Sequence, residues 1–275
     1  MSKTIVLTGA GGVLCSTLAK ALAKEGHKVA VLDLKKDAAD KVAEEINILG
    51  GAAIGVMANV LEKPSLEAAK KEVNEKFGPC DILINGAGGN HPLGTTSNPH
   101  FIEEDLNNTT EGFKTFFDLD TAGIQFTFNL NFIGTLLPTQ IFARDMVGRE
   151  GCSILNISSM NAFTPLTKIP AYSGAKAAVS NFTQWLSVHF SKVGIRVNAL
   201  APGFFLTDQN RTLLTESNGE LTPRGNTIIG QTPMGRFGEP EDLIGTTLWL
   251  CGEGASFVTG VVVPIDGGFS AFSGV

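Results

Sequence analysis

Short apolar runs alternate with helical patterns along almost the whole chain, and this alternation constrains the fold more than any other feature of the sequence. Apolar residues stand at successive positions, rather than at every second one, in runs such as TIVL and DILI. That pattern is typical of strands covered on both faces, and strands joined by helices form right-handed βαβ units. The sequence therefore predicts an α/β fold with one doubly wound parallel sheet of about seven strands and helices on both faces.

Turn residues and hydrophobic periodicity set the expected limits of each element. The expected strands are Thr4–Leu7, Lys28–Leu34, Ala52–Ala58, Asp81–Asn85, Cys152–Ile157, Arg196–Leu200 and Val261–Ile265. The expected helices are Val13–Lys24, Asp37–Leu49, Ser65–Phe77, Ala122–Val147, Ala171–Lys192 and Pro240–Leu250. Since no linker, repeat or low-complexity tract interrupts them, residues 1–275 are expected to form a single domain.

Two segments interrupt the rhythm of strands and helices. Gly89–Leu119 is rich in Gly, Asn, Thr and Pro, and Gly203–Gly238 is similarly irregular. Long irregular loops in a compact domain are usually functional or disordered, and ligands of doubly wound sheets bind at the carboxyl ends of the strands. Because both segments follow strand ends, we expect a substrate-side insert near 89–119 and a lid near 203–238.

Composition argues against several classes of partner. The chain has a formal net charge of −6 and no run of basic residues, so neither nucleic acid nor a membrane surface is an expected partner. No apolar run approaches the length of a membrane span. The four cysteines, at 15, 80, 152 and 251, lack the paired spacing of metal sites. We therefore expect reduced thiols, no metal and a cytoplasmic location.

A glycine-rich turn joins the first expected strand to the first helix. Its sequence, TGAGGVLC, lets the backbone approach a pyrophosphate, and the helix N-terminus offers free N–H groups. Such a turn alone is a weak signal, since tight turns need glycine anyway. An acidic residue follows at the end of the second strand, about twenty residues on, where a carboxylate accepts hydrogen bonds from the adenosine ribose. The residues expected to hold a dinucleotide here are Gly9, Gly11, Gly12, Val13, Leu14 and Asp33.

Asp33 also bears on the choice between the two nicotinamide cofactors. A carboxylate repels a 2′-phosphate, and NADP sites supply a cation instead. Residue 34 is Leu and the glycine-rich turn holds no cation, whereas Lys35 and Lys36 are near enough in sequence to reach the site. We therefore expect NAD, with NADP as the less favoured alternative.

The segment AYSGAKAAVSNF places Tyr172 and Lys176 four residues apart on an expected helix. That spacing puts both side chains on one face, with Cβ atoms about 5–6 Å apart. An ammonium at that distance favours the phenolate by about 3 kcal/mol, which would take the tyrosine pKa from about 10 toward about 8. Tyr172 is thus expected to exchange a proton with a substrate alcohol near neutral pH. A solvated surface pair is the alternative for these two residues alone.

With its neighbours, this pair resembles the Tyr-x-x-x-Lys motif of the short-chain dehydrogenase/reductase family, and the resemblance covers nearly the whole chain. Ser159 in NISSM lies thirteen positions before the tyrosine, and Asn131 in NLNFIGT matches the family's helix asparagine. Further family turns appear as NGAG at Asn85–Gly88, as Asn198, Pro202, Gly203 and Thr207, and as Thr259, Gly260, Asp266, Gly267 and Gly268. Each motif is modest, but their joint order and spacing are specific. The resemblance implies a Rossmann fold.

The resemblance also implies an NAD(P)-dependent enzyme that transfers hydride between a carbinol carbon and nicotinamide C4. In that enzyme Tyr172 is the general acid/base, Lys176 lowers its pKa and binds the nicotinamide ribose, and Ser159 bonds the substrate oxygen. Asn131 would hold a water that links Lys176 to solvent. The further cofactor contacts that the resemblance implies are Asn59, Val60, Asn85, Gly86, Ala87, Tyr172, Lys176, Pro202, Gly203, Phe205 and Thr207.

The sequence departs from the family pattern at four positions. Val13 and Cys15 stand where the pattern T-G-x-x-x-G-x-G has its second and third glycines. Asn59 replaces the aspartate that meets adenine, and Gly86 replaces the second asparagine of NNAG. We expect these departures to affect the geometry around the phosphates and adenine rather than the fold.

The two irregular segments supply the clues to the substrate. The phrases GAGGNHP, SSMNAFTPLTKIPAYS and PGFFLTDQNR resemble the short-chain class of D-mannonate oxidoreductases, also called fructuronate reductases, which implies interconversion of D-fructuronate and D-mannonate. A sugar acid needs hydroxyl partners and a cation for its carboxylate. The expected substrate contacts are Asn90, His91, Ser159, Asn161 and Arg211, with Lys168, Asn210 and Arg224 as further candidates.

Alternatives stay open at this point. Gluconate 5-dehydrogenase and mannitol dehydrogenase-like enzymes are the nearest, while the long insert disfavours a 3-oxoacyl reductase. A non-catalytic dinucleotide-binding regulator is disfavoured by the intact Ser/Tyr/Lys/Asn set. The family is often tetrameric through its fifth and sixth helices, here near Ala122–Val147 and Ala171–Lys192, so we expect a homo-oligomer and favour a tetramer.

Overall fold

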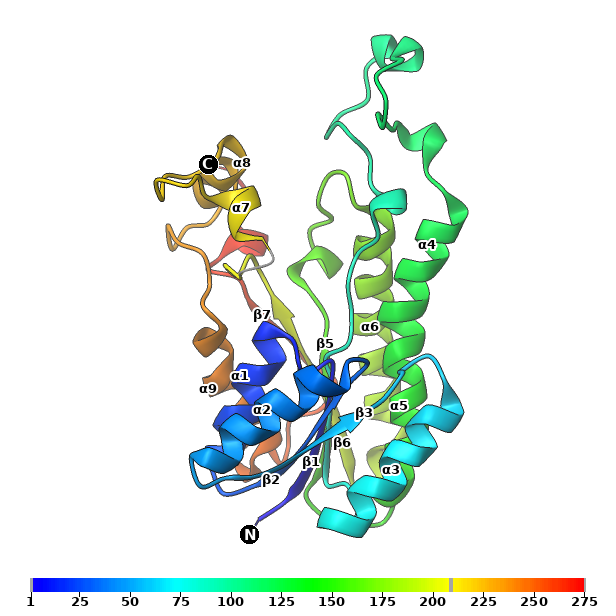
Figure 1. The fold of residues 1–275 in the computed structure, drawn as a ribbon, viewed down its shortest axis with the longest axis vertical. Helices are drawn as coiled ribbons and strands as arrows, with labels where there is room; N and C mark the ends of the chain where they lie inside the picture. The colour runs from blue at the N-terminus through cyan, green and yellow to red at the C-terminus, as the bar shows by residue number, and fades with distance from the viewer. Residues whose placement is uncertain (1, 208–209, 275) are drawn as a thin grey trace.

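The computed structural model describes residues 2–207 and 210–274, and it contains a seven-stranded parallel sheet (Figure 1). The strands are β1 (Thr4–Thr8), β2 (Lys28–Asp33), β3 (Ala52–Met57), β4 (Ile82–Asn85), β5 (Cys152–Ile157), β6 (Ile195–Pro202) and β7 (Val262–Ile265). They pair in the order β3-β2-β1-β4-β5-β6-β7. The expected doubly wound sheet is confirmed, and each strand ends within two residues of its expected limits.

Helices cover both faces of the sheet (Figure 1). One face carries α1 (Val13–Lys24), α2 (Lys36–Ile48) and α9 (Ile244–Cys251), and the other carries α3 (Lys63–Phe77), α5 (Gly134–Phe142) and α6 (Pro170–His189). α4 (Thr121–Phe128) packs against α6, and two short helices, α7 (Arg211–Leu214) and α8 (Pro223–Gly230), lie in the 203–238 segment. Short 3-10 turns occupy Pro92–Gly94, Glu103–Asn107, Phe116–Asp118, Ala143–Asp145, Met160–Ala162, Ser191–Val193, Pro240–Leu243, Glu253–Ala255 and Phe269–Ala271.

The two-sided core explains why the strands are apolar at successive positions. In β1, Ile5 and Leu7 pack into the cluster that includes residues of α1, α2 and α9, whereas Val6 packs into the cluster of α3, α5 and α6. All three side chains are fully buried. Successive residues of a strand point to opposite faces, so a strand covered on both faces needs apolar residues without alternation.

The expected helix over residues 122–147 is divided in the structure. A π-helical segment, Asn129–Ile133, separates α4 from α5, and a 3-10 turn ends the helical run at Asp145. π-helical turns are rare and frequently mark functional sites. α3 also begins two residues before its expected start, because Pro64 fits its first turn, while the Ser65 hydroxyl accepts a hydrogen bond from Asn59 N–H.

The strand order places a candidate ligand site between β1 and β4. The chain winds outward in opposite directions from these two central strands, which makes their carboxyl ends a topological switch point where ligands bind in such sheets. The 89–119 and 203–238 segments follow β4 and β6 and rise beyond the same end of the sheet (Figure 1). The 89–119 segment extends past α4 and α6 as a projecting arm.

Candidate functional site

The turn after β1 is shaped for close approach of its backbone. Gly9 has φ +64, and a Cβ at this position would lie 2.8 Å from the Cα of Ala87 after β4. α1 begins at Val13, and the preceding residue, Gly12, has no side chain that could cap the helix. The first N–H groups of this helix are therefore left for a ligand, and the helix dipole favours an anion there.

Asp33 is bonded to this turn. Its Oδ2 accepts a hydrogen bond from Gly11 N (3.0 Å), and its Oδ1 accepts one from Lys35 N (3.0 Å). The Lys36 ammonium forms an ion pair with Asp40 on the next turn of α2. The backbone thus fixes the Asp33 carboxylate beside the turn. Of the two lysines near it in sequence, Lys36 is paired with Asp40 of its own helix.

Thr8 links the ends of β1 and β4, and sequence reasoning missed it as a site residue. Its Oγ1 accepts hydrogen bonds from the N–H groups of Gly86 (3.1 Å) and Ala87 (3.3 Å), and it is fully buried. Its position as the first residue of the T-G pattern was the signal that could have found it. The hydroxyl holds the β4 end against the phosphate turn.

Tyr172, Ser159 and Lys176 come together where β5 ends and α6 begins. α6 starts at Pro170, so Tyr172 lies in its first turn and Lys176 one turn later. The Ser159 hydroxyl lies near enough to the Tyr172 hydroxyl to lower the pKa of the phenol through hydrogen bonding. The Lys176 Nζ lies 5.6 Å from the centroid of the Tyr172 ring and donates to the carbonyl of Ile157 (2.7 Å). The structure therefore assembles three of the four residues that the family motif selects.

Of the two serines in NISSM, only Ser159 faces this group. The Ser158 hydroxyl is bonded to the Lys176 carbonyl (3.1 Å) and to the Ser180 hydroxyl (2.7 Å), so it ties β5 to α6. The Ser159 hydroxyl also accepts a hydrogen bond from Asn161 N (3.3 Å). Because neighbouring residues of an extended chain point to opposite sides, one serine is structural and the next reaches the site.

Burial changes the pKa values of the Tyr172–Lys176 pair in a way that pairwise spacing did not predict. Desolvation raises the pKa of Tyr172 above its ordinary value, and the hydrogen bond with Ser159 offsets this only in part. Desolvation also lowers the pKa of Lys176 to about 8. The expectation that Lys176 brings the pKa of Tyr172 toward about 8 is therefore wrong for the protein without cofactor, because desolvation of the phenol dominates and raises its pKa.

The Asn131 side chain anchors the start of the 89–119 segment. Its Nδ2 donates to the carbonyls of Gly89 (2.7 Å) and Thr127 (2.7 Å), and its Oδ1 accepts a hydrogen bond from Gly89 N (3.3 Å). The π-helical turn aims Asn131 at this backbone. Since both amide hydrogens are already donated, the expected relay water would have to bind Oδ1 or a neighbouring carbonyl. That role stays a prediction.

Two of the asparagines expected at the cofactor are engaged within the chain. Asn85 is buried, and its Nδ2 donates to Thr139 Oγ1 (3.0 Å) and Asn156 Oδ1 (2.8 Å), which joins β4 to α5 and β5. The amide nitrogen of Asn85 is thus used within the core, whereas its Oδ1 has no hydrogen-bond partner, and a contact with the cofactor stays a prediction. The Asn59 side chain donates to Glu62 (2.9 Å) in the turn before α3, so a contact with adenine would require exchange of this bond.

The base of the 203–238 segment is packed against the C-terminal turn. A Cβ on Gly203 would lie 2.6 Å from the Cα of Asp266, so the chain can pass there only as glycine. The Asn210 side chain accepts a hydrogen bond from Thr207 N (2.8 Å) and donates to the carbonyl of Phe205 (2.8 Å). Asn210, a candidate substrate residue, therefore serves the loop itself, and residues 208–209 of the expected lid lie outside the described residues.

The substrate candidates of the insert also bond locally, in contrast to Asn161. Asn90 Nδ2 donates to Thr95 (2.9 Å), and His91 Nδ1 accepts a hydrogen bond from Leu93 N (3.2 Å). Asn161 is 4% exposed, and its Oδ1 has no hydrogen-bond partner in the structure. A buried amide oxygen without a partner is costly, which suggests that a ligand supplies a hydroxyl donor there.

The three candidate cations differ in their setting. Arg211 begins α7 and Arg224 lies in α8, and both are exposed. Lys168 is half-buried in the segment between Ser159 and Tyr172, and it has φ +74, the one left-handed backbone among described residues other than glycine. Its carbonyl accepts a hydrogen bond from Thr96 N (2.9 Å), which attaches the insert to this segment.

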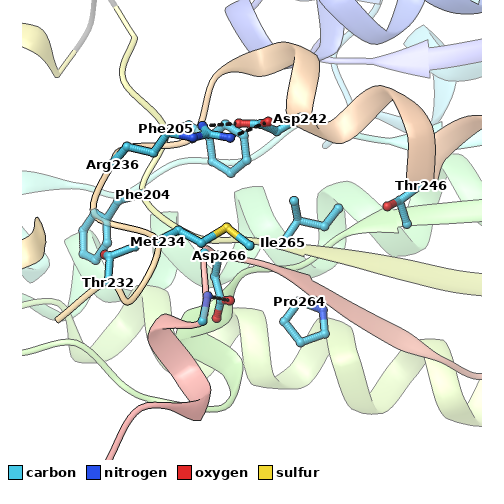
Figure 2. Close-up of a pocket in the computed structure, with 13 residues that line it drawn as sticks. Phe204, Phe205, Thr232, Met234, Arg236, Asp242, Thr246, Pro264, Ile265 and Asp266 are labelled. Carbon is cyan, nitrogen blue, oxygen red and sulfur yellow. Dashed lines mark hydrogen bonds and ion pairs between the residues drawn. The ribbon is translucent and has the colours of Figure 1, made fainter. Parts of the chain in front are cut away.

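A cavity of about 420 Å³ lies between the lid, β7 and the start of α9 (Figure 2). Its charged groups are paired: Arg236 bonds Asp242 through both guanidinium NH groups, and Asp266 accepts hydrogen bonds from Ser270. Phe205 is the one expected cofactor residue that lines it, and this ring lies against Gly238. Tyr172, Ser159 and Lys176 do not line this cavity.

Among the described residues, no three potential metal ligands lie together, and no helix is long and apolar enough to cross a membrane. All four cysteines are free and buried.

The model of the short chain dehydrogenase family matches residues 3–218 of this sequence. The chain belongs to the short-chain dehydrogenase family. The expected fold class is confirmed with it, as is the expectation of an enzyme, an oxidoreductase that acts on a CH–OH group.

Three relatives illustrate what the chain is similar to. It is 61% identical to an uncharacterized oxidoreductase of Haemophilus influenzae, over all of this chain and 95% of the relative. A crystal structure of a Haemophilus influenzae protein with bound NAD, provisionally described as a D-mannonate oxidoreductase, matches with a TM-score of 0.94 at 59% identity and covers 99% of this chain and 96% of that one. The 5-keto-D-gluconate 5-reductase of Escherichia coli K12 is 27% identical, over 97% of this chain and 94% of the relative.

Proposed function

We propose that the protein is an NAD-dependent oxidoreductase that interconverts a sugar acid and its keto form, and that the pair is D-mannonate and D-fructuronate. The convergence of Ser159, Tyr172 and Lys176 at the carboxyl end of β5 carries the chemical part of this proposal. The similarity to the NAD-bound structure and the polar residues around the site support the substrate.

NAD fits the residues around the β1–β4 switch point. The pyrophosphate would lie over Gly11, Gly12 and the first N–H groups of α1, where the Gly9–Ala87 contact leaves room only for backbone. Asp33 would accept the adenosine ribose hydroxyls, since its carboxylate is already oriented by two backbone N–H groups. A 2′-phosphate would meet this carboxylate, with Leu34 next to it, so NAD is favoured over NADP.

Proton transfer falls to Tyr172. When bound, NAD would accept or supply the hydride. The Tyr172 hydroxyl exchanges the proton of the substrate oxygen, and the hydroxyl of Ser159 donates a hydrogen bond to the same oxygen. Lys176 approaches the ring from the side of the sheet and stabilises the phenolate, while Asn131 holds Gly89 against this group. The raised pKa of Tyr172 in the free protein keeps the phenol protonated, ready to donate in the reductive direction.

The sugar-acid part of the proposal needs hydroxyl partners and a cation. The unpartnered buried Oδ1 of Asn161 would accept a hydrogen bond from a substrate hydroxyl, and His91 is proposed as a further hydroxyl partner. Arg211 is proposed as the main carboxylate partner because it follows Thr207 on the segment that we expect to cover the nicotinamide end. Lys168 is proposed to add a second positive charge beside Tyr172.

A comparison of D-mannonate with mannitol tests this function. NAD reduction is monitored through the absorbance of NADH. We expect kcat/KM for D-mannonate to be at least about tenfold higher than for mannitol, since a charge-assisted hydrogen bond contributes about 1.5–3 kcal/mol. Equal kcat/KM for the two substrates would refute the sugar-acid proposal. Arg211→Ala should reduce kcat/KM for the acid far more than for mannitol. An equal loss on both substrates would exclude Arg211 as the carboxylate partner without refuting the sugar-acid proposal.

D-Gluconate is the second candidate, because the chain is also similar to a 5-keto-D-gluconate 5-reductase. The same assay with D-gluconate separates the two acids. A cytoplasmic location and a homotetramer are further parts of the proposal. The buried free cysteines fit a reducing compartment, and the exposed aromatic residues of α4 and α6, such as Phe126 and Trp185, fit helices that meet a second copy.

A further inference from the structure

Cys15 and Gly86, two of the departures from the family pattern, meet in the structure. Cys15 lies in the first turn of α1, and Gly86 directly follows β4. A Cβ built on Gly86 would lie 2.2 Å from the Cys15 Sγ and 2.8 Å from the carbonyl oxygen of Thr8. No nonbonded carbon approaches a sulfur so closely, so the thiol occupies the space that a side chain at position 86 would need.

The segment that begins at Gly86 is held from both sides. A Cβ on Gly9 would lie 2.8 Å from the Cα of Ala87, which fixes one side against the phosphate turn. A Cβ on Gly88 would lie 2.7 Å from Asn131 Oδ1 and 3.1 Å from Lys176 Nζ, which fixes the other. Residues 86–88 therefore lie tightly packed between the cofactor turn and the proposed proton-transfer group, so we expect a displacement at 86 to affect both.

The Cys15 thiol is suited to act through its volume. Burial raises its pKa to about 11, while the charge of Lys176 lowers it and the charge of Asp33 raises it to smaller extents. A thiol in this state is neutral, and it is 6% exposed. Reactive cysteines are thiolates in accessible positive surroundings, whereas a buried neutral thiol behaves as a small polarizable apolar group.

We propose that Cys15 and Gly86 are a complementary positioning pair that sets the distance between α1 and residues 86–89, and thereby places the phosphate turn relative to Asn131 and Lys176. The proposal rests on the NAD site proposed above. Cys15 supplies the volume and Gly86 leaves room for it, so neither residue needs to touch the reacting atoms. Removing the thiol leaves a void, and adding a side chain at 86 overfills the same space.

Four proteins test the pair through their affinity for NAD: the unaltered chain, Cys15→Gly, Gly86→Ala and the double variant. We expect each single variant to raise the Kd for NAD, measured by calorimetry, by about tenfold, equivalent to about 1.4 kcal/mol. In the double variant the alanine methyl group enters the space vacated by the thiol. Its Kd should therefore lie closer to that of the unaltered protein than the Kd of either single variant.

A matched control and a folding measurement complete the test. Cys251→Ala removes another buried thiol, from α9, and should lower the Tm without changing the Kd for NAD. If the increase in Kd for the double variant equals the product of the increases for the two single variants, the two sites are independent and the proposed pair is refuted. If Gly86→Ala alone does not fold, we expect the double variant with Cys15→Gly to fold. A double variant that also fails to fold would refute the proposed pair.

Different results would refute the Cys15–Gly86 pair and the proposed function. If the unaltered protein does not bind NAD, the proposed cofactor is wrong, whereas the Tm values of the same four proteins still report whether the two positions are coupled. If NAD binds and the double variant is no better than Gly86→Ala, the Thr8 carbonyl alone excludes a side chain at 86, and the proposal about Cys15 fails.

Discussion

The cofactor side and the substrate side of the site are built from different parts of the chain. Around the phosphate turn, backbone meets backbone: Gly9 faces Ala87, and Thr8 holds the β4 end through two N–H groups. In the insert and the lid, polar side chains such as Asn90 and Asn210 mostly bond their own loops. Close backbone packing tolerates no added atom, so the spacing of sequence motifs identifies the residues of the cofactor side well. It identifies those of the substrate side much less well.

This difference has a consequence for substitutions. A change on the cofactor side should act through shape and alter binding of the dinucleotide for every substrate. A change on the substrate side should act through charge or a single hydrogen bond and alter the choice between substrates.

Tyr172→Phe should have the largest effect. The phenol is the group that exchanges the substrate proton, and general acid–base catalysis contributes about 10²–10⁴-fold, so turnover should fall by about that factor. The Kd for NAD should stay nearly unchanged, because the ring and its packing remain. Steady-state kinetics and calorimetry on the same preparation measure both quantities. Activity above a tenth of the unaltered level at the pH optimum would remove Tyr172 from the acid/base role.

Lys176→Met tests the buried charge at the same junction. Desolvation lowers the pKa of Lys176 from 10.5 to about 8, so its ammonium destabilises the folded state at neutral pH. The contribution of the lysine to stability is greatest above pH 10.5 and is lost as pH falls through about 8. Relative to the unaltered protein, the Met variant should therefore gain stability toward neutral pH, by up to about 3 kcal/mol at about 1.4 kcal/mol per pKa unit.

Denaturant unfolding of the cofactor-free proteins at several values between pH 7 and pH 10 measures this difference. Making the same comparison in the Tyr172→Phe background removes the phenol, the one tyrosine of the chain, from the titration. A difference that does not change with pH would show that Lys176 is solvated in the folded protein. The Met variant should be inactive at every pH, so the residue costs stability and is retained for function.

The parts of the molecule that sequence predicted are those determined by local pattern. Strand limits followed from apolar runs, because coverage on both faces leaves no alternation to misjudge. The π-helical turn at Asn131 could not be predicted in this way, since it depends on bonds to Gly89, 42 residues earlier in the chain. Helical periodicity describes the neighbours of a residue within its helix and not its distant partners.

The site shows the same limit. The spacing of Tyr172 and Lys176 predicted their proximity, but a uniform dielectric gave the wrong direction for the pKa of the tyrosine, because burial is a property of the whole fold. The side chains of Asn59 and Asn90 were expected at ligands, and the structure engages both within their own turns. A short polar side chain in a loop can hydrogen-bond the loop backbone about as readily as a ligand, and only the structure distinguishes the two.

Cofactor choice sharpens the comparison on the adenosine side. The unaltered protein should prefer NAD over NADP, because the Asp33 carboxylate is held in place by Gly11 and Lys35 and would oppose a 2′-phosphate. Asp33→Ala combined with Leu34→Arg should narrow or reverse the preference, measured as the ratio of kcat/KM values. The ratio between D-mannonate and mannitol should stay the same in this variant. A preference for NADP in the unaltered protein would show that Lys35 overrides the carboxylate.

The smallest effect is expected at Lys168, on the substrate side. A left-handed conformation costs a residue with a Cβ about 1–2 kcal/mol, whereas glycine adopts it without strain. Glycine also loses about 0.5–1 kcal/mol through the greater entropy of its unfolded chain, so Lys168→Gly should gain up to about 1 kcal/mol in the free energy of unfolding. The hydrogen bond from Thr96 to the carbonyl of residue 168 involves only backbone atoms and should persist.

Lys168→Ala is the matched control for Lys168→Gly, because it removes the ammonium but keeps the Cβ and its strain. Both variants should lower kcat/KM for D-mannonate several-fold while leaving mannitol unaffected, but only the glycine variant should be more stable than the unaltered protein. A stabilised glycine variant with full activity on the acid would mean that the strained lysine has no role in binding the carboxylate. A strained backbone that a single substitution can relieve persists where its side chain is needed, and here that side chain carries a positive charge four residues before Tyr172.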